Sequence, residues 1–258
     1  MTIKSKEIGS EFFPKYDFYN KAISYPYLAP SKPFSFVNGK CLEGIHVSLE
    51  NRIPILSVGS NRSPYQLKNK FSLSENLCVV NATLINSDIV YSASISPYGS
   101  IPATQWPLKG SEVKLNVLWL NERQLNTMHL TEGIGIAYNF AELKEGSVII
   151  QGINYKGPVY GYISINGVYN FNDKLPVGLS SLKSSQRKLK SINELQALKF
   201  LKNHLGVGHM SLKKWIQEVI KNKNYRIQLV NKMVKESLMP NDPPWKVIDV
   251  NVRGIKIV

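Results

Sequence analysis

The chain has 258 residues, of which 43% are hydrophobic and 19% are charged, and its formal net charge at pH 7 is +14. These proportions are typical of a globular protein that buries a full core, and they exclude an intrinsically disordered chain. The two cysteines, Cys41 and Cys78, lie far apart in the sequence, which argues against a disulfide scaffold and against a thiolate metal site.

The N-terminus and the uncharged stretches do not have the pattern of a targeting or membrane segment. Met1–Ser10 carries Lys4, Lys6 and Glu7 without an apolar core, so we expect no signal peptide. The uncharged stretch Ser94–Leu108 is rich in Pro, Ser and Gly, so it does not predict a membrane span. We therefore expect a cytoplasmic protein without membrane association.

We expect three regions along the chain. Residues 1–49 are rich in aromatic residues and Pro, which predicts an extended arm that packs its rings against the core. Residues 50–171 form the predicted core, in which the Asn86-Ser87-Asp88 cluster is typical of a hairpin turn. The predicted core strands are Ile53–Val58, Cys78–Leu84, Ile89–Ile95, Glu112–Leu120, Ile134–Leu143, Ser147–Ile153 and Pro158–Ile165.

Two short helices are predicted within the core. The first is Pro64–Phe71, with Ser63 as its N-cap and proline at its first position. The second is Glu122–Thr131, with Asn121 as its cap.

Residues 172–258 are predicted to form a basic helical extension. A Ser/Lys-rich linker at Ser180–Ser191 precedes it, and a strand-like segment at Val247–Val252 follows the helices. The predicted helices are Asn193–Leu205, a segment capped by Ser211, and Ile227–Leu238. We interpret their apolar stripes as facing the core.

The positive charge is concentrated in this extension. Between Lys183 and Lys235 there are thirteen Lys or Arg residues and two acids, Glu194 and Glu218. Such a block can contact nucleic acid or another polyanion, and the other interpretation is a solvated basic surface on helices. We favour the solvated surface.

The sequence lacks the usual motifs for metals and cofactors. His46, His129, His204 and His209 are not at ligand spacing, so no metal site is predicted. No dinucleotide-binding, Walker or nucleophile-elbow motif is present. We therefore expect a mechanism without a cofactor.

Two segments carry a resemblance to a known family. Gly59-Ser60-Asn61 follows an apolar strand, and Gly110-Ser-Glu-Val113 leads through Trp119 to a helix that ends at Glu132-Gly133. Over roughly residues 50–145 this order resembles the γ-glutamylcyclotransferase-like family. The chain departs from the family pattern at Val58, where the family usually has a tyrosine.

The resemblance implies a fold and a set of site residues. It implies an α+β fold with a mixed small β-barrel and flanking short helices, to which this chain adds its N-terminal arm and C-terminal extension. Glu132 corresponds to the family's catalytic glutamate, and Tyr138 is similar to a tyrosine near the family's pocket. The remaining expected substrate-binding residues are Gly59, Ser60, Asn61 and Tyr98, the last of which lies on a loop with two prolines.

The activity implied is the cyclisation of a γ-glutamyl amide or peptide to pyroglutamate with release of the amine. In this chemistry Glu132 would move protons, and main-chain N–H groups of the Gly59–Asn61 turn would bind the oxyanion. The helix start at Ser63–Leu67 would bind the substrate carboxylate.

Other interpretations remain open at this stage. Glu132 is also compatible with a surface position at a helix end, and the fold is compatible with an amide-bond enzyme that acts on another acyl group. A third alternative is a non-catalytic binding module whose basic segment 183–235 contacts nucleic acid or an acidic partner. The sequence indicates neither the leaving group nor the oligomeric state.

Overall fold

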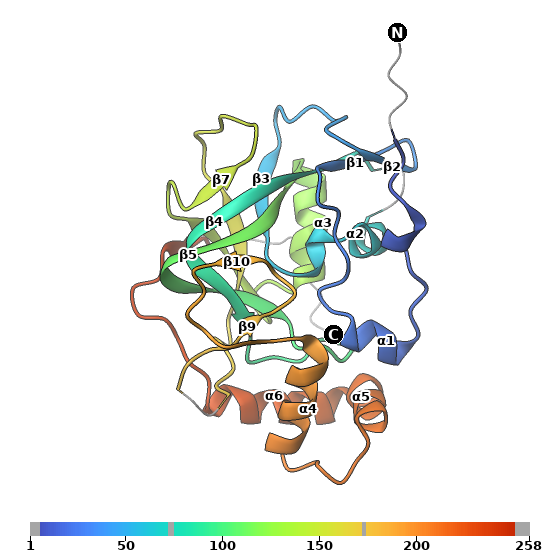
Figure 1. The fold of residues 1–258 in the computed structure, drawn as a ribbon, viewed down its shortest axis with the longest axis vertical. Coiled ribbons are helices and arrows are strands. Elements are labelled where there is room, and N and C mark those ends of the chain that lie inside the picture. Colours follow the sequence, from blue (N-terminus) through green and yellow to red (C-terminus); the bar gives the residue numbers. More distant parts are fainter. Residues whose placement is uncertain (1–5, 72–74, 172–173, 251–258) are drawn as a thin grey trace.

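The computed structural model describes residues 6–71, 75–171 and 174–250, in which one mixed sheet carries helices around it (Figure 1). Most neighbouring strands are antiparallel, but β3 pairs with β8, and β9 with β11, in parallel. The strands are β1 Phe34–Val37, β2 Lys40–Glu43, β3 Ile53–Ser57, β4 Leu77–Tyr91, β5 Ala103–Leu120, β6 Tyr138–Leu143, β7 Val148–Ile150, β8 Tyr160–Ser164, β9 Gly178–Leu179, β10 Ser184–Ser185, β11 Ser191–Ile192 and β12 Trp245–Val247.

The helices fall into an N-terminal, a central and a C-terminal set. The helices are α1 Phe18–Ile23, α2 Pro64–Lys70, α3 Glu122–Glu132, α4 Glu194–His204, α5 Leu212–Lys221 and α6 Lys223–Lys235, with short 3-10 turns η1 Ser10–Phe12 and η2 Ser60–Arg62. Within the described residues, none of them is both long and apolar enough to cross a membrane.

The strands confirm the α+β class but not a closed barrel. In the described part of the chain the sheet runs as an open path from β11 through β9, β4, β5, β3, β8 and β6 to β12. The strand β4 pairs with β5 along its length and with β1, β7 and β9 at different positions on its other edge. The three short strands β1, β7 and β9 therefore occupy successive parts of one edge of β4, and the sheet stays open.

The predicted hairpin at Asn86-Ser87-Asp88 is wrong. β4 continues through this cluster as one strand, with a shift of register between Ile85 and Ser87 against β5. Asn86 has a φ of 55°, and its Oδ1 accepts a hydrogen bond from the Gly110 N–H at 3.0 Å. The polar cluster therefore forms a bulge inside a long strand, and the reversal occurs later, around Ser96–Ser100.

The N-terminal residues are more structured than an extended arm. They contain α1, whose N-cap Asp17 accepts a hydrogen bond from the Asn20 N–H, and the β1–β2 hairpin, which joins the sheet through β4. Four of their aromatic side chains are buried, namely Tyr25, Tyr27, Phe34 and Phe36.

The C-terminal helices lie below the sheet in Figure 1, with α1 close to α5. Leu198, Leu201 and Trp215 are fully buried in the same cluster as the inner face of β4 and β5, so the apolar stripes face the core. The predicted linker at Ser180–Ser191 instead contributes β10 and the start of β11 to the sheet. The predicted strand at Val247–Val252 is displaced, because β12 ends at Val247 and residues 248–250 are not in a strand; positions 251 and 252 lie outside the described residues.

Candidate functional site

The helix α3 brings Glu132 to the sheet. Asn121 and Gln124 form a reciprocal capping box at its start, and Gly133 ends it in the left-handed conformation with a φ of 64°. These two signals fix the length of the helix, so that Glu132 is its last residue. The Glu132 side chain is 13% exposed, which excludes the surface position left open by the sequence.

The turn after β3 lies against this carboxylate. Gly59 leads into η2, and the Asn61 side chain from η2 donates a hydrogen bond from Nδ2 to Glu132 Oε1 at 2.9 Å. The same oxygen forms an ion pair with Lys70 Nζ, whose side chain is 9% exposed. Two segments separated by some seventy residues therefore meet at one carboxylate.

Glu132 and the turn line one cavity of about 170 Å³. All six residues predicted from the sequence for the site border it, namely Gly59, Ser60, Asn61, Tyr98, Glu132 and Tyr138. The remaining polar lining includes Tyr25, Gln66, Lys70, Thr131 and Tyr162. The cavity thus combines one carboxylate and one ammonium with several hydroxyl and amide groups.

The turn also offers main-chain donors. Within the described residues, the N–H groups of Gly59, Ser60 and Asn61 donate to no protein acceptor, whereas the next two, of Arg62 and Ser63, close back onto the turn. Unpaired N–H groups that border a cavity can bind an anionic oxygen. The side chain of Glu132 faces the same cavity, so a proton acceptor and anion-binding donors are adjacent.

The tyrosine hydroxyls at the cavity stay protonated at neutral pH. Burial, and then the charge of Glu132, raise the pKa of Tyr98 to about 12, although hydrogen bonding with Ser60 and Ser100 acts in the opposite direction. Burial and Glu132 also raise the pKa of Tyr138 well above its usual range. The Tyr98 hydroxyl can therefore donate a hydrogen bond to a ligand, whereas the Tyr138 hydroxyl already donates its proton inside the protein.

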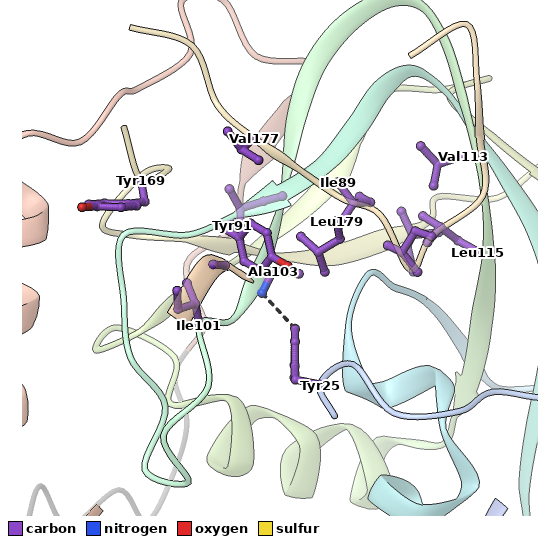
Figure 2. Close-up of a cluster of buried hydrophobic side chains, with 14 of the residues drawn as sticks. Tyr25, Ile89, Tyr91, Ile101, Ala103, Val113, Leu115, Tyr169, Val177 and Leu179 are labelled. Carbon is purple, nitrogen blue, oxygen red and sulfur yellow. Dashed lines mark hydrogen bonds between the residues drawn. The ribbon is translucent and has the colours of Figure 1, made fainter. Parts of the chain in front are cut away.

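A tyrosine that the sequence did not single out lies at the turn. Val58 precedes the turn and has no hydroxyl, but Tyr25 from the N-terminal residues places its own hydroxyl against Gly59, where an added Cβ would collide with it. The Tyr25 hydroxyl accepts a hydrogen bond from the Ala103 N–H at 2.8 Å (Figure 2). Tyr138 donates to the Ala103 carbonyl at 3.3 Å, so two tyrosines hold the start of β5.

The start of α2 does not provide the anion site that the sequence predicted. Ser63 occupies the N-cap position, but its side chain caps no N–H group, and of Ser63–Leu67 the cavity is lined by Gln66. Leu67 is fully buried in the core. The positive group at the cavity is instead Lys70, from the last turn of the same helix.

Sequence reasoning missed Lys70 and Gln66, although a signal for them exists. They are four residues apart, so they share one face of the predicted helix. Once Asn61 is placed at the cavity, the helix that follows it must direct one polar face the same way. No comparable signal exists for Tyr25, because it reaches the turn through tertiary packing.

Within residues 6–71, 75–171 and 174–250, there is no group of three or more His, Cys, Asp or Glu side chains that could hold a metal ion. The buried His129 accepts or donates one hydrogen bond with the Tyr162 hydroxyl at 2.8 Å, and its other packing partners are aromatic rings.

Several cations of the basic segment serve the fold itself. Arg187 pairs with the buried Asp88 through Nε and Nη2, and the Lys202 ammonium donates to three main-chain carbonyls within residues 207–210. Arg226 donates to the carbonyl of Val219 at 2.7 Å. Fewer positive charges of the segment are therefore available to an outside partner than its composition suggests.

No model of a protein family and no curated protein matches the sequence. Among solved structures, the chain is similar to a gamma-glutamyl cyclotransferase, with 16% identity, a TM-score of 0.36, and coverage of 77% of this chain and 94% of that one. It is similar to an uncharacterized protein from Homo sapiens, with 18% identity, a TM-score of 0.35, and coverage of 78% and 95%. A protein from Arabidopsis thaliana is 20% identical, with a TM-score of 0.36 and coverage of 49% and 84%.

These similarities include the family that the sequence resembles. Their identities and TM-scores are too low to assign an activity to this chain. The function therefore has to be inferred from the residues that border the cavity.

Proposed function

We propose that the protein cyclises a γ-glutamyl amide or peptide to pyroglutamate and releases the amine, with Glu132 as the proton-transfer residue. The observation that carries the proposal is that Glu132 and the unpaired N–H groups of the Gly59–Asn61 turn border the same small cavity. This arrangement supplies the two groups that an intramolecular acyl transfer requires.

The reaction itself needs no external nucleophile. Glu132 takes a proton from the substrate's α-ammonium, and the free amine attacks the γ-carbonyl carbon to close the five-membered ring. The second proton leaves the ring nitrogen as the bond from the carbonyl carbon to the leaving nitrogen breaks. Both protons end on the departing amine, which leaves as an ammonium ion.

The turn stabilises the charge that develops during ring closure. As the carbonyl carbon becomes tetrahedral, its oxygen gains negative charge, and the N–H groups of Gly59, Ser60 and Asn61 can bind that oxygen. Holding the amine and the carbonyl in attack geometry can contribute roughly 7–11 kcal/mol, because the reaction becomes unimolecular. The small cavity volume serves this purpose, since it restricts the conformations of the bound acyl group.

Lys70 and the tyrosine hydroxyls have supporting roles. Lys70 and Asn61 hold one oxygen of Glu132, which leaves the other oxygen for the substrate amine. The Lys70 ammonium and the Tyr98 hydroxyl also border the cavity and can bind the substrate's α-carboxylate. This places the anion site at the end of α2 and on the Ser96–Ser100 loop.

The direct test is to incubate the purified chain with a panel of γ-glutamyl amides and to measure pyroglutamate. We expect product from at least one substrate with the wild type, and a kcat/KM lowered by about 10² to 10⁴ in Glu132→Gln, because the proton acceptor is lost. Glu122→Gln is the matched control, since it removes the same charge from the exposed first turn of the same helix.

Two results would remove Glu132 from this role. One is the absence of pyroglutamate with every substrate, although the chain is folded. The other is unchanged turnover in Glu132→Gln. If Glu122→Gln lost as much activity as Glu132→Gln, the effect would come from helix charge instead of from the cavity.

The alternative of a polyanion-binding module is less well supported. It relies on the basic segment 183–235, in which Arg187, Lys202 and Arg226 are used for contacts inside the protein. The cavity at Glu132 has no role in that alternative.

A further inference from the structure

A second and larger cavity lies between residues 24–31 and the strands β4 and β5. Its volume is about 690 Å³, within the range of small-molecule sites. Its charged lining residues are Arg62, Lys114 and Lys183, and no Asp or Glu of the described residues lines it. Its amide-bearing lining residues are Asn81, Asn116 and Gln151.

The hydrogen bonds at this cavity leave donors facing it. Arg62 donates from Nε to Asn116 Oδ1 at 2.8 Å, Asn116 donates from Nδ2 to Asn81 Oδ1 at 3.1 Å, and Asn81 donates to the Ser31 carbonyl at 2.8 Å. Each side-chain amide oxygen in this chain of bonds already accepts a hydrogen bond. Within the described residues the two terminal nitrogens of Arg62 have no acceptor.

Among the described residues, no acidic side chain balances the charge of the Arg62 guanidinium. It forms no ion pair among the described residues, although it is half-buried. Burial lowers the pKa of Arg62 to about 10, so the side chain remains charged at neutral pH. A charge taken partly out of water without a partner is unfavourable, and an anion in the cavity would compensate it.

The two lysines supply an independent observation. β10 pairs with β5 such that Ser184 is opposite Val113, and next to this pair the Lys114 N–H donates to the Lys183 carbonyl at 2.9 Å. Two lysines are thus opposite each other on neighbouring strands, and both line the cavity. Like charges in this position repel. The Lys114 ammonium donates to Thr83 Oγ1 at 3.1 Å, and a bound anion between the two lysines would offset their repulsion.

From this arrangement we infer that the second cavity binds a small anion with at least two negative oxygens, carried by carboxylate or phosphate groups. Arg62 is the central ligand, because its planar fork of donors suits a carboxylate or a phosphate. Lys114 and Lys183 are exposed and bind the ligand at the mouth of the cavity. The inference does not depend on the reaction proposed for Glu132.

The position of the cavity relates it to the first site. Arg62 and Asn61 are consecutive residues of η2, and they face the second and the first cavity respectively. Tyr25 lines both. A ligand on Arg62 therefore contacts the same turn that presents Asn61 to Glu132.

The test is calorimetric titration of the full chain with succinate, inorganic phosphate and pyrophosphate, each at constant ionic strength. We expect at least one of the three to bind, and the preferred probe distinguishes a carboxylate from a phosphate ligand. Arg62→Gln should weaken its binding at least tenfold. Arg123→Gln is the matched control, because Arg123 is an exposed arginine that pairs with Glu75 away from the cavity.

A second variant tests the site even if Arg62→Gln does not fold. The exposed pair Lys114→Gln/Lys183→Gln should also weaken binding at least tenfold while the chain keeps its thermal unfolding transition. The inference is overturned if no probe binds the wild type, or if binding survives both the Arg62 and the double lysine variants. It is equally overturned if Arg123→Gln weakens binding as much as Arg62→Gln, since binding would then reflect net charge alone.

Discussion

Two glutamates lie at helix ends, the partly buried Glu132 and the buried Glu194, and they are held in different ways. Glu132 pairs with an ammonium, accepts a hydrogen bond from Asn61, and faces a cavity. Glu194 is 3% exposed, accepts a hydrogen bond from the Ile101 N–H at 2.7 Å, and has no partner for Oε2 within the described residues. Burial raises the pKa of Glu194 well above its usual range.

This difference in surroundings distinguishes a carboxylate that a ligand can reach from a carboxyl group that makes only an internal structural contact. A carboxylate with a cation on one oxygen and a cavity beside it can meet a substrate and exchange a proton with it. A carboxyl group buried at the start of α4, where burial favours its neutral form, ties that helix to the segment before β5. Burial alone therefore does not identify a functional acid. The ion-pair partner of the carboxylate and the presence of a cavity beside it distinguish the two cases.

The largest expected effect comes from removing the cation of the first glutamate. Lys70→Met keeps the apolar length of the side chain but leaves the partly buried Glu132 without its ion partner. We expect the free energy of unfolding to fall by about 3 kcal/mol, the lower end of the range for breaking a buried pair. Chemical denaturation of Lys70→Met, Glu132→Gln and the double variant measures this coupling.

A surface pair of the same chemistry is the control for this prediction. Lys32 and Glu43 also form an ion pair, but their side chains are 67% and 29% exposed. Lys32→Met should change the free energy of unfolding by less than about 1 kcal/mol. Equal losses in Lys70→Met and Lys32→Met would show that burial does not strengthen the contact at Glu132.

His129 extends the comparison to a buried base on the same helix as Glu132. Its side chain is 2% exposed, and burial lowers its pKa to about 4. The unfolded chain, with a pKa near ~6.5 at this position, binds the proton more readily than the folded chain does. Stability from this group is therefore present above pH ~6.5 and is lost as the pH falls toward 4, by about 3 kcal/mol in total.

The measurement is the free energy of unfolding between pH 7.5 and 4 for the wild type and for His129→Gln. Glutamine can still accept a hydrogen bond from the Tyr162 hydroxyl, and it does not titrate. We expect the acid-induced loss of stability to shrink in the variant. If the two curves remained parallel, the lowered pKa of His129 would be refuted.

Glu194→Gln should have a smaller effect and the opposite dependence on pH. Because the pKa of Glu194 is raised in the folded chain, its contribution is most favourable below the unfolded pKa of ~4.5 and declines as the pH rises above it. The amide keeps an acceptor for the Ile101 N–H and has no charge to desolvate. We expect Glu194→Gln to be more stable than the wild type at pH 8, by roughly 1–3 kcal/mol, and similar to it near pH 4.

Chemical denaturation at these two pH values tests the sign directly. Glu132→Gln is the contrasting variant, since it removes an ion pair and should not stabilise the chain at pH 8. A loss of stability in Glu194→Gln at pH 8 would mean that this carboxyl is charged in the fold, and the distinction between the two glutamates would fail.

The sequence predicts the first glutamate well because its signals are local. The Asn121 cap and Gly133 bound α3, and the apolar run before Gly59 predicts the strand that leads into the turn. The resemblance then places these two segments together, which no local pattern could do. The capped helices α4 and α5 were predicted for the same reason.

Features that depend on tertiary contacts could not be read from the sequence. Asn86 has the composition of a turn, yet pairing with β5 makes it a bulge inside a continuous strand. The short strands β9 and β10 form on the edges of the long strands β4 and β5, and β11 pairs in turn with β9, so none of the three is fixed by its own residues alone. The contact of Tyr25 with the Gly59 turn, and the cavity around Arg62, depend on how the N-terminal residues pack across the sheet.

The smallest expected effect concerns a hydroxyl beside Glu132. Tyr138→Phe removes a donor that reaches the Ala103 carbonyl at 3.3 Å, a long hydrogen bond, so we expect a loss of stability of at most about 1 kcal/mol. Its effect on kcat/KM for pyroglutamate formation should be less than tenfold, because the proton acceptor and the turn remain.

Tyr169→Phe is the matched control, since the Tyr169 hydroxyl is buried without a partner in the described part of the chain and lies outside the cavity of Glu132. That variant should keep full activity and lose no stability, because it removes a polar group that the fold leaves unpaired. If Tyr138→Phe behaved like Tyr169→Phe in both measurements, Tyr138 would be a packing residue, and the groups that distinguish Glu132 from Glu194 would reduce to Lys70, Asn61 and the turn.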